Sequence, residues 1–374
     1  MLPEAGYTWS EIRSGFDRIM LLLALMLFAL GLLSIYSASM VVRQPTLAYV
    51  LRQTMWAGIS SVIYVIILRV GYRNLIRLGY WMYGATLISL AVLDALGADS
   101  NSIERWFRFG GVGFQPAELG KVTIILMLSR FCPRHPPENI KNLAGVLVLS
   151  GASVLMILLQ PDLGSALVYV AVIFSVLTVG GTPGKYLGSA VVAALCAMPF
   201  LWDKLHEYQK LRLIVFLDPY IDPQGAGYNV IQSRIAVGSG GLWGKGFLHG
   251  TQGRLHFLPE PQTDFIFSVF AEEFGFVGGV LVVVLFAGLF WRILRGAFRT
   301  RDIRAKLLCV GIVTWLWFQV MESIAMSMGL APITGLPLPL FSYGGSSLLM
   351  VTIGLALAQS VAISSAKEKV VQIS

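Results

Sequence analysis

The sequence contains few charged residues for its length. Asp, Glu, Lys and Arg make up 13% of its 374 residues, about half of the ~25% found in soluble proteins. Hydrophobic residues make up 56%. So little polar material cannot cover a water-soluble globule. This excludes a soluble protein and indicates an integral membrane protein in contact with membrane lipids.

Cysteine and histidine are also scarce. The three cysteines, Cys132, Cys196 and Cys309, are odd in number, form no CxxC pair and lie in or beside apolar runs. This pattern excludes a disulfide framework and a cysteine-based zinc site. The four histidines form no HExxH or similar arrangement. The sequence therefore predicts no metal site built from protein ligands.

The net charge of +8 does not require a nucleic-acid partner. In a membrane protein, an excess of Lys and Arg is typical of cytoplasmic loops, which is known as the positive-inside rule. We therefore expect no nucleic-acid binding, and the positions of these residues orient the chain instead.

Ten apolar stretches approach the ~20 residues that a helix needs to cross a bilayer. They lack the alternation typical of an outer-membrane β-barrel. We expect an all-α integral membrane protein with about ten transmembrane helices, an uncleaved first span and one polytopic domain over 1–374. The predicted spans are 18–40, 47–68, 75–96, 114–131, 143–160, 163–181, 185–202, 264–291, 305–330 and 342–364.

The loop charges place both ends of the chain in the cytoplasm. If the first span enters from that side, most Lys and Arg fall in cytoplasmic segments. The one long hydrophilic connection, 203–262, then lies on the extracytoplasmic side. Within it, Tyr208–Leu217 and Val230–Val237 are amphipathic, so we expect short helices at the membrane interface there.

Ionisable residues inside membrane helices, or at their ends, are costly and usually functional. In this orientation, charged residues from five separate segments reach the extracytoplasmic face, which predicts a charged, outward-facing cavity. Three further acids, Glu272, Glu273 and Glu322, lie within predicted spans. The residues assigned to the extracytoplasmic face are Arg52, Arg105, Arg108, Glu118, Lys121, Asp162 and Asp264.

Most of these residues also have a structural explanation. Glu118 and Lys121 are three residues apart, so they share a helix face and could simply neutralise each other. Asp162 could cap the helix that follows it. Asp264 could also be a helix cap, but it joins the long polar loop to a membrane helix. Partial desolvation there would raise its pKa and suit it to act as a general base.

The glycine-rich segment 238–246 is reminiscent of a phosphate-binding loop. It fails the G-x-x-x-x-G-K-[ST] pattern, because Ser239 and Gly246 stand where Gly and Ser or Thr are required. Its backbone N–H groups, with Lys245, could still bind an anion. The alternative is a flexible surface loop.

Eight short motifs occur in order along the chain. They are RWF at 105–107, FQPAELGK at 114–121, QPDLG at 160–164, FLPE at 257–260, TDFIF at 263–267, AEE at 271–273, PLPL at 337–340 and SYGGS at 342–346. Together they resemble the SEDS family, which contains RodA, FtsW and SpoVE. The GFLHGTQ run at 246–252 is more similar to the RodA branch. Gln262 departs from the pattern, because many relatives have histidine there.

This resemblance implies ten membrane helices and an enzyme, a peptidoglycan glycosyltransferase. The implied substrate is lipid II, a disaccharide-pentapeptide carried on undecaprenyl pyrophosphate. The implied reaction builds β-1,4 glycan strands with inversion and releases undecaprenyl pyrophosphate, for cell elongation and rod shape. The resemblance further implies a place in the bacterial inner membrane, an active site on the extracytoplasmic side, and a class B penicillin-binding protein as partner.

The resemblance also assigns site residues. Asp264 matches the essential aspartate of the family, and Glu118, Lys121 and Asp162 match the charged residues of its other motifs. An inverting transfer needs a base for the acceptor hydroxyl, so our hypothesis makes Asp264 that base. The cations that would hold pyrophosphate are Arg52, Arg105, Lys121 and Lys245.

The sequence requires no cofactor, although a divalent cation, Mg²⁺ or Mn²⁺, is compatible with a pyrophosphate leaving group. Two alternative functions stay open. One is a flippase that moves lipid II across the membrane, although transporters usually bind near the midplane. The other is a non-catalytic scaffold for a transpeptidase, which would not need acids and bases on five segments.

Overall fold

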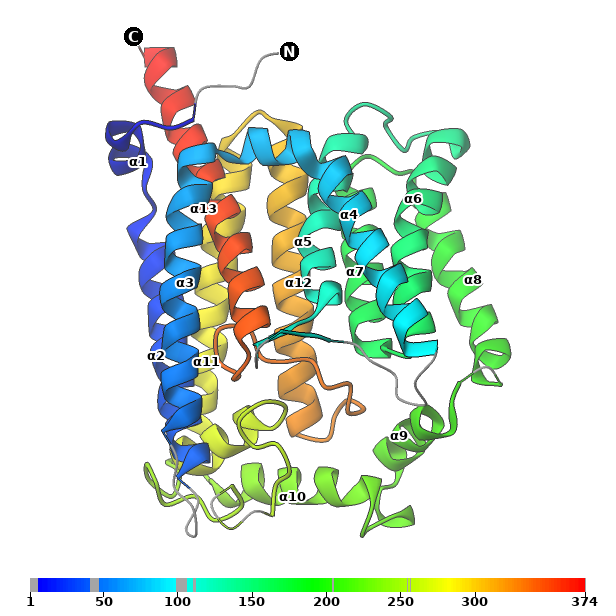
Figure 1. Cartoon of the computed structure of the whole chain (residues 1–374), viewed down its shortest axis with the longest axis vertical. Coiled ribbons are helices and arrows are strands. Elements are labelled where there is room, and N and C mark those ends of the chain that lie inside the picture. The colour runs from blue at the N-terminus through cyan, green and yellow to red at the C-terminus, as the bar shows by residue number, and fades with distance from the viewer. Residues whose placement is uncertain are drawn as a thin grey trace.

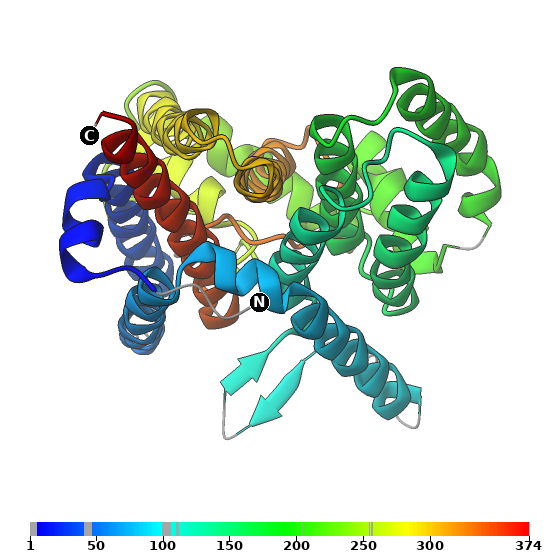
Figure 2. The ribbon, with the colours of Figure 1, turned by 90° about the horizontal axis from the view of Figure 1, so that it is seen from above.

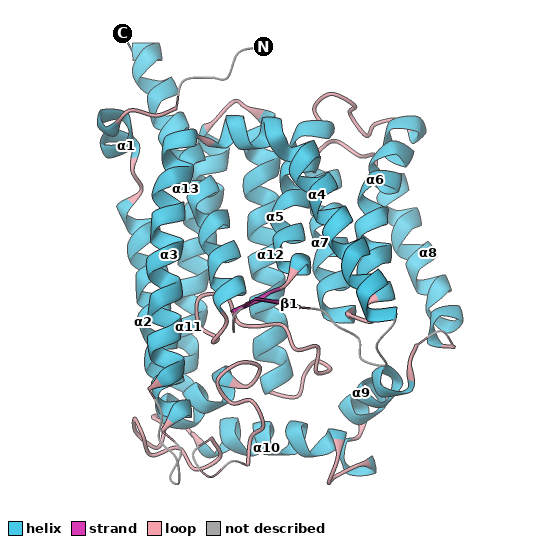
Figure 3. Cartoon of the chain, viewed as in Figure 1, coloured by secondary structure: helices cyan, strands magenta, loops and turns pink. Residues whose placement is uncertain are grey.

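Long helices make up most of the structure (Figure 1). The computed structural model describes residues 6–40, 47–98, 106–109, 112–203, 205–253, 255 and 257–373. Within these ranges the chain forms α-helices, the 3-10 helix η1 (Pro219–Ile221) and one hairpin (Figure 3). The α-helices are α1 (Trp9–Gly15), α2 (Arg18–Ser39), α3 (Ala48–Val70), α4 (Tyr72–Ala98), α5 (Pro116–Phe131), α6 (Ile140–Leu159), α7 (Leu163–Val179), α8 (Gly184–Trp202), α9 (Glu207–Leu217), α10 (Ala226–Ser239), α11 (Ile266–Arg299), α12 (Ile303–Ser327) and α13 (Gly345–Ile373).

Each of the ten predicted spans coincides with one helix, which confirms a multi-pass, helical membrane protein. Among the described residues, seven helices are long and apolar enough to cross a bilayer: α2, α3, α4, α6, α11, α12 and α13. α7 and α8 are shorter apolar helices. α5 has only 16 residues and is almost entirely buried. A helix enclosed by protein need not match the bilayer thickness, so the exact number of crossings stays a prediction.

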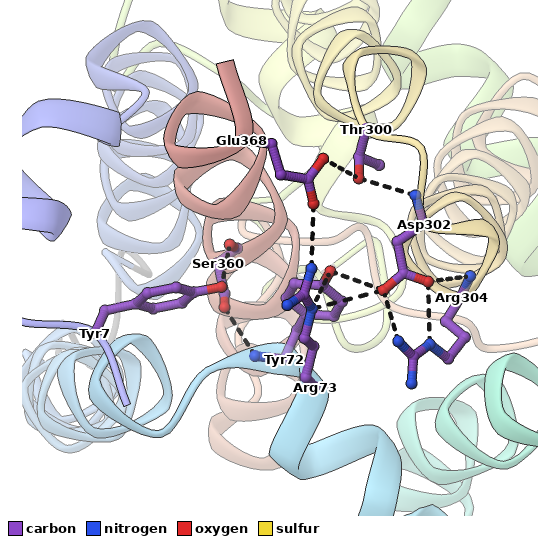
Figure 4. Close-up of polar contacts among 8 residues, drawn as sticks. All are labelled: Tyr7, Tyr72, Arg73, Thr300, Asp302, Arg304, Ser360 and Glu368. Atoms are coloured by element: carbon purple, nitrogen blue, oxygen red, sulfur yellow. Dashed lines mark hydrogen bonds and ion pairs between the residues drawn. The ribbon is translucent and has the colours of Figure 1, made fainter. Parts of the chain in front are cut away.

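The beginning of the first membrane helix, α2, and the end of the last, α13, lie on the same side of the bundle (Figure 1). α1 lies against the C-terminal part of α13, where a Cβ on Gly15 would touch Ile363 (Figure 1). Nearby, Arg73 of α4 forms ion pairs with Asp302, the N-cap of α12, at 3.6 Å and with Glu368 of α13 at 3.1 Å (Figure 4). Because the membrane-spanning part of the chain begins and ends on one side, it crosses the membrane an even number of times, as the predicted orientation requires.

Two short helices lie at the other end of the bundle. α10 runs crosswise to the long helices and α9 lies beside it (Figure 1). They contain the stretches Val230–Val237 and Tyr208–Leu217, which the sequence predicts to be amphipathic helices. Both stretches are indeed helical.

The hairpin that precedes α5 departs from the all-helical prediction. β1 (Phe107–Phe109) pairs antiparallel with β2 (Val112–Phe114), and the hairpin projects from the bundle beside α4 (Figure 2). Phe109 pairs with Val112, and two glycines, Gly110 and Gly111, separate them in the sequence. A Gly-Gly pair between short apolar runs is a typical hairpin signal, but strands of only three residues are too short to show a clear alternating pattern.

α11 coincides with the span predicted over 264–291, but it is broken near its beginning. At Gly275 the backbone takes φ +66° and ψ −163°, and two helices meet there. The glycine-rich segment 238–246 supplies partners for the backbone groups that this break releases. The N–H groups of Lys245 and Gly246 donate to the carbonyls of Glu272 and Glu273, both at 3.0 Å, and those of Phe276 and Val277 donate to Gly241 and Leu242 at 2.9 and 3.1 Å.

This packing bears on the expectation of an anion site in the glycine-rich segment. Its N–H groups at Lys245 and Gly246 already donate to protein carbonyls, so these two groups are not available to an anion. Irregular backbone within a membrane bundle needs such partners. The close approach requires glycine at position 244, where φ is +80° and a Cβ would lie 2.0 Å from the Glu273 carbonyl oxygen.

Gly244→Ala should lower the thermal stability of the protein, because it combines left-handed backbone strain with a clash against α11. The expected loss in free energy of unfolding is about 2–4 kcal/mol, and thermal melting of the purified protein in detergent measures it. The matched control is Gly58→Ala on α3, whose added Cβ meets nothing within 4 Å. Equal melting of the two variants would show that the segment does not close the break.

Candidate active site

Asp264 lies two residues before α11 and does not cap it. The N-cap position belongs to Phe265, which makes no side-chain cap bond. The helix-cap explanation of Asp264 is therefore wrong. Burial raises the pKa of the Asp264 carboxyl, and the charge of Glu260 adds to the rise, whereas the Thr263 hydroxyl and Arg212 lower it. The carboxylate is thus partly desolvated beside a cation.

The loop between α12 and α13, residues 328–344, holds the Asp264 segment by its backbone. The Ser342 hydroxyl donates to the Thr263 carbonyl at 2.8 Å, and the Tyr343 N–H donates to the Gln262 carbonyl at 2.9 Å. The same loop approaches the carboxylate itself, because a Cβ on Gly335 would lie 3.5 Å from Asp264 Oδ2. This α12–α13 loop therefore holds the backbone before Asp264 and lies against its carboxylate.

The α12–α13 loop and the start of α13 also connect to α3 and α5. On α3, the Gln53 amide donates to the Ser342 carbonyl at 3.2 Å and accepts from the Gly344 N–H at 3.1 Å. Before α5, the Gln115 N–H donates to the Ser346 hydroxyl at 3.4 Å. Arg52 adjoins buried Gln53 and is itself exposed. The loop thus joins the segments that carry Arg52 and the Glu118 motif to the Asp264 segment.

On its other side, the α12–α13 loop meets α7, α9 and α12. Arg212 of α9 donates to the Ile333 carbonyl at 3.1 Å, and Thr334 donates its hydroxyl to Glu322 of α12. A Cβ on Gly164 would lie 2.9 Å from Thr334 Cβ. A cavity of about 80 Å³ opens between α7, α9 and this loop. Its polar lining includes Asp162, Tyr208, Gln209, Arg212 and Thr334.

Asp162 has the structural role that the sequence allows. It is the N-cap of α7, and its carboxylate accepts from the Ser165 N–H at 3.0 Å and from the Ser165 hydroxyl at 2.9 Å. It also lines the cavity that contains Arg212. The capping explanation accounts for its contacts, and its place in the cavity keeps it near the Asp264 segment.

Glu118 and Lys121 form the ion pair that their spacing predicts. Lys121 Nζ lies 2.5 Å from Glu118 Oε1, and the two residues are only 1% and 3% exposed. The second carboxylate oxygen, Glu118 Oε2, has no hydrogen-bond partner among the described residues. Burial of two charges is tolerable only because they neutralise each other, so the pair has at least a structural role.

Lys245 forms an ion pair with Glu272 and not with Asp264. Its Nζ is 2.6 Å from Glu272 Oε1, and Glu272 is fully buried. The same carboxylate accepts the N–H of Thr251 at 2.8 Å, its hydroxyl at 2.9 Å and the N–H of Gln252 at 3.1 Å. Next to it, Glu273 accepts the Ser37 hydroxyl of α2. The GFLHGTQ motif is therefore folded around Glu272 and Glu273.

The structure brings together part of the predicted site. Asp264 and Asp162 lie around one loop, which also contacts the segments of Arg52 and Glu118, whereas Lys245 pairs with Glu272. Arg105 lies outside the described residues, as does the side chain of Arg108. Among the described residues, no three His, Cys, Asp or Glu side chains gather as a metal-binding group.

Several residues of the site were missed from the sequence. Gln53 had a signal, since it is a polar residue beside Arg52 in an apolar span. Arg212 and Thr334 had none, because their roles depend on how α9 and the α12–α13 loop fold back onto the bundle. Ser342 falls within the SYGGS motif, but the motif did not reveal its partner, the Thr263 carbonyl.

The mutual neutralisation of the ion pair on α5 can be tested by its effect on stability. Lys121→Met should destabilise the protein by about 3–5 kcal/mol, because it leaves Glu118 buried without a cation. Adding Glu118→Gln should restore much of the thermal stability, since no unpaired charge then remains. Melting curves of the single and double variants in detergent measure this. A double variant as unstable as the single one would contradict mutual neutralisation.

Comparison with known proteins agrees with the motifs. Residues 17–367 match the model of the FtsW/RodA/SpoVE family, described as "Cell cycle protein". The chain is 38% identical to the peptidoglycan glycosyltransferase MrdB of Escherichia coli strain K12 over 361 residues, which is 96% of each protein.

Solved structures show the same relationship. A chain from a peptidoglycan synthase complex, in a study of coordinated polymerization and crosslinking, superposes with a TM-score of 0.79 at 32% identity, over 93% of this chain and 97% of that chain. The Thermus thermophilus rod shape determining protein RodA superposes with a TM-score of 0.70 at 31% identity, over 93% and 96%. The motifs, the fold and these similarities agree, and the chain belongs to the FtsW/RodA/SpoVE family, also called SEDS.

Proposed function

We propose that this protein is a peptidoglycan glycosyltransferase that polymerises lipid II into β-1,4 glycan strands for cell elongation and rod shape. The main support is the environment of Asp264, whose carboxylate does not cap α11, lies against the α12–α13 loop, and is close enough to Arg212 for that charge to lower its pKa. The activity named for Escherichia coli MrdB, similar over nearly the whole chain, agrees with it.

In the proposed reaction, Asp264 acts as the general base. The 4-hydroxyl oxygen of the acceptor sugar attacks the anomeric carbon of the donor, and the bond from that carbon to pyrophosphate breaks with inversion. The hydroxyl proton passes to the Asp264 carboxylate, and undecaprenyl pyrophosphate leaves. One base is sufficient for such a displacement, and a raised pKa improves proton acceptance near neutral pH.

The departing pyrophosphate needs positive charge rather than a strong general acid. We assign this role first to Arg52, Arg105 and Arg212. Lys121 and Lys245 are each paired with a buried glutamate, so in this proposal they act through the field of those pairs. The protein needs no resident cofactor for this chemistry, and any Mg²⁺ or Mn²⁺ would bind with the substrate's pyrophosphate.

The proposed site faces the extracytoplasmic side of the bacterial inner membrane. α11 ends beside Asp302, near α1 and the end of α13, so Asp264 before its start belongs to the opposite end of the bundle (Figure 1). The positive-inside rule assigns the end with the termini to the cytoplasm. The similarity to a chain of a peptidoglycan synthase complex supports a class B penicillin-binding protein as partner.

Asp264→Asn should reduce lipid II polymerisation by about 10²–10⁴-fold, because the amide keeps the shape of the carboxylate but cannot accept the proton. Gel sizing of glycan made by purified protein from lipid II measures the loss. Glu260→Gln, an exposed carboxylate four residues earlier, is the control and should stay active.

Near wild-type polymerisation by Asp264→Asn would show that Asp264 is not the general base. If wild-type protein made no glycan but moved labelled lipid II across vesicles, the flippase function would replace the proposal. If it neither made glycan nor moved lipid II, the scaffold function would replace the proposal.

The acid limb of the pH–rate profile should also report on Asp264. A base works only above its pKa, so its raised pKa places this limb above the pH expected for an ordinary aspartate. Arg212→Gln removes an interaction that lowers the pKa and should move the limb to higher pH. Glu260→Gln removes one that raises it and should move the limb to lower pH. Shifts in the same direction would exclude Asp264 as the titrating group.

A further inference from the structure

A cluster of arginines lines a cavity at the end of the bundle opposite Asp264. The cavity has a volume of about 290 Å³, and five of its seven lining residues are arginines. Arginine is the side chain best suited to bind phosphate groups, because its planar guanidinium donates two parallel hydrogen bonds. We call these five residues the arginine wall. They are Arg73, Arg77, Arg130, Arg134 and Arg304, and the other lining residues are Ile76 and Pro133.

Carboxylates neutralise only part of the arginine wall. Asp302 pairs with Arg304 at 3.0 Å and with Arg73 at 3.6 Å, and Glu368 pairs with Arg73 at 3.1 Å (Figure 4). Arg130 and Arg134 form no ion pair with a described residue. The wall therefore carries more positive than negative charge.

Arg130 has an unused donor at this place. Its Nη1 donates to the Arg77 carbonyl and its guanidinium lies 4.4 Å from the ring centre of Tyr80. Its Nε–H is buried and lacks a hydrogen-bond partner among the described residues. A buried guanidinium donor without a partner is costly, and an anion in the cavity would offset the uncompensated charge around it.

The N-terminus of α4 makes the excess of charge more unfavourable. Arg73 and Arg77 lie in the first two turns of α4, which has no acid in its first turn, whereas α12, which carries Arg304, has Asp302 as its N-cap. Helix N-termini carry partial positive charge and disfavour cations. The positive-inside rule explains why arginines occur at this end, but not why several of them surround one cavity.

We propose that the arginine wall binds a phosphate-bearing anion on the cytoplasmic side. Two sources offer this chemistry: the head group of an anionic lipid of the cytoplasmic leaflet, and a soluble phosphate compound. Basic cavities between membrane helices on this side commonly hold anionic head groups. The apolar Ile76 and Pro133 in the same lining suit the glycerol and acyl region of a lipid.

The test compares lipid retention and thermal protection in the full-length protein. Native mass spectrometry counts phosphatidylglycerol or phosphatidylcholine retained from mixed micelles, and melting in lipid-free detergent measures protection by pyrophosphate. Wild type should retain phosphatidylglycerol over phosphatidylcholine, and Arg77→Gln/Arg134→Gln should weaken that retention by about ten-fold or more. Arg295→Gln/Arg299→Gln removes two exposed arginines of α11 at the same end of the bundle and should bind like wild type.

Each outcome decides the proposal. Wall-dependent retention of phosphatidylglycerol identifies a lipid site, and wall-dependent protection by pyrophosphate alone identifies a site for soluble phosphate. Equal losses in both double variants, or no response of wild type to either probe, would overturn it. If the wall variant does not fold, Arg134→Gln alone replaces it, because Arg134 is exposed; a single variant that binds like wild type would also count against the wall.

Discussion

Irregular backbone inside a membrane bundle must find its hydrogen-bond partners within the protein. This constraint decides the structure at two places, the break in α11 at Gly275 and the α12–α13 loop. At the break, the glycine-rich segment supplies both donors and acceptors. In the loop, side chains of Gln53 and Ser342 bond to backbone groups. Both departures from helix are therefore stable features.

The two irregular segments place the acids of the site. The break in α11 ends a short helix that carries Glu272 and Glu273, and these carboxylates organise the 245–252 segment. The α12–α13 loop bonds to the backbone on the N-terminal side of Asp264. The potential base is thus positioned by main-chain contacts on one side and by the start of α11 on the other, which leaves its carboxylate available for chemistry.

The membrane helices could be predicted from the sequence because burial in lipid requires long apolar runs, and such runs are visible without tertiary information. The position of Asp264 between a polar loop and an apolar span could also be recognised from the neighbouring residues alone. The pairing of Lys245 with Glu272 and the approach of Arg212 to Ile333 did not. They depend on contacts between segments distant in sequence, which a single sequence does not encode in any local pattern. The break at Gly275 could not be predicted either, because glycine is common in membrane helices and does not by itself mark a break.

The bond between the Ser342 hydroxyl and the Thr263 carbonyl joins residues 79 positions apart, with two long helices, α11 and α12, between them. During biosynthesis the chain emerges from its N-terminus, so Asp264 enters the bilayer well before the loop that immobilises it. A nascent chain that has not yet delivered the α12–α13 loop therefore lacks the contacts that hold this segment. Insertion of the last part of the chain completes them, and the Asp264 segment is held in position only from that moment.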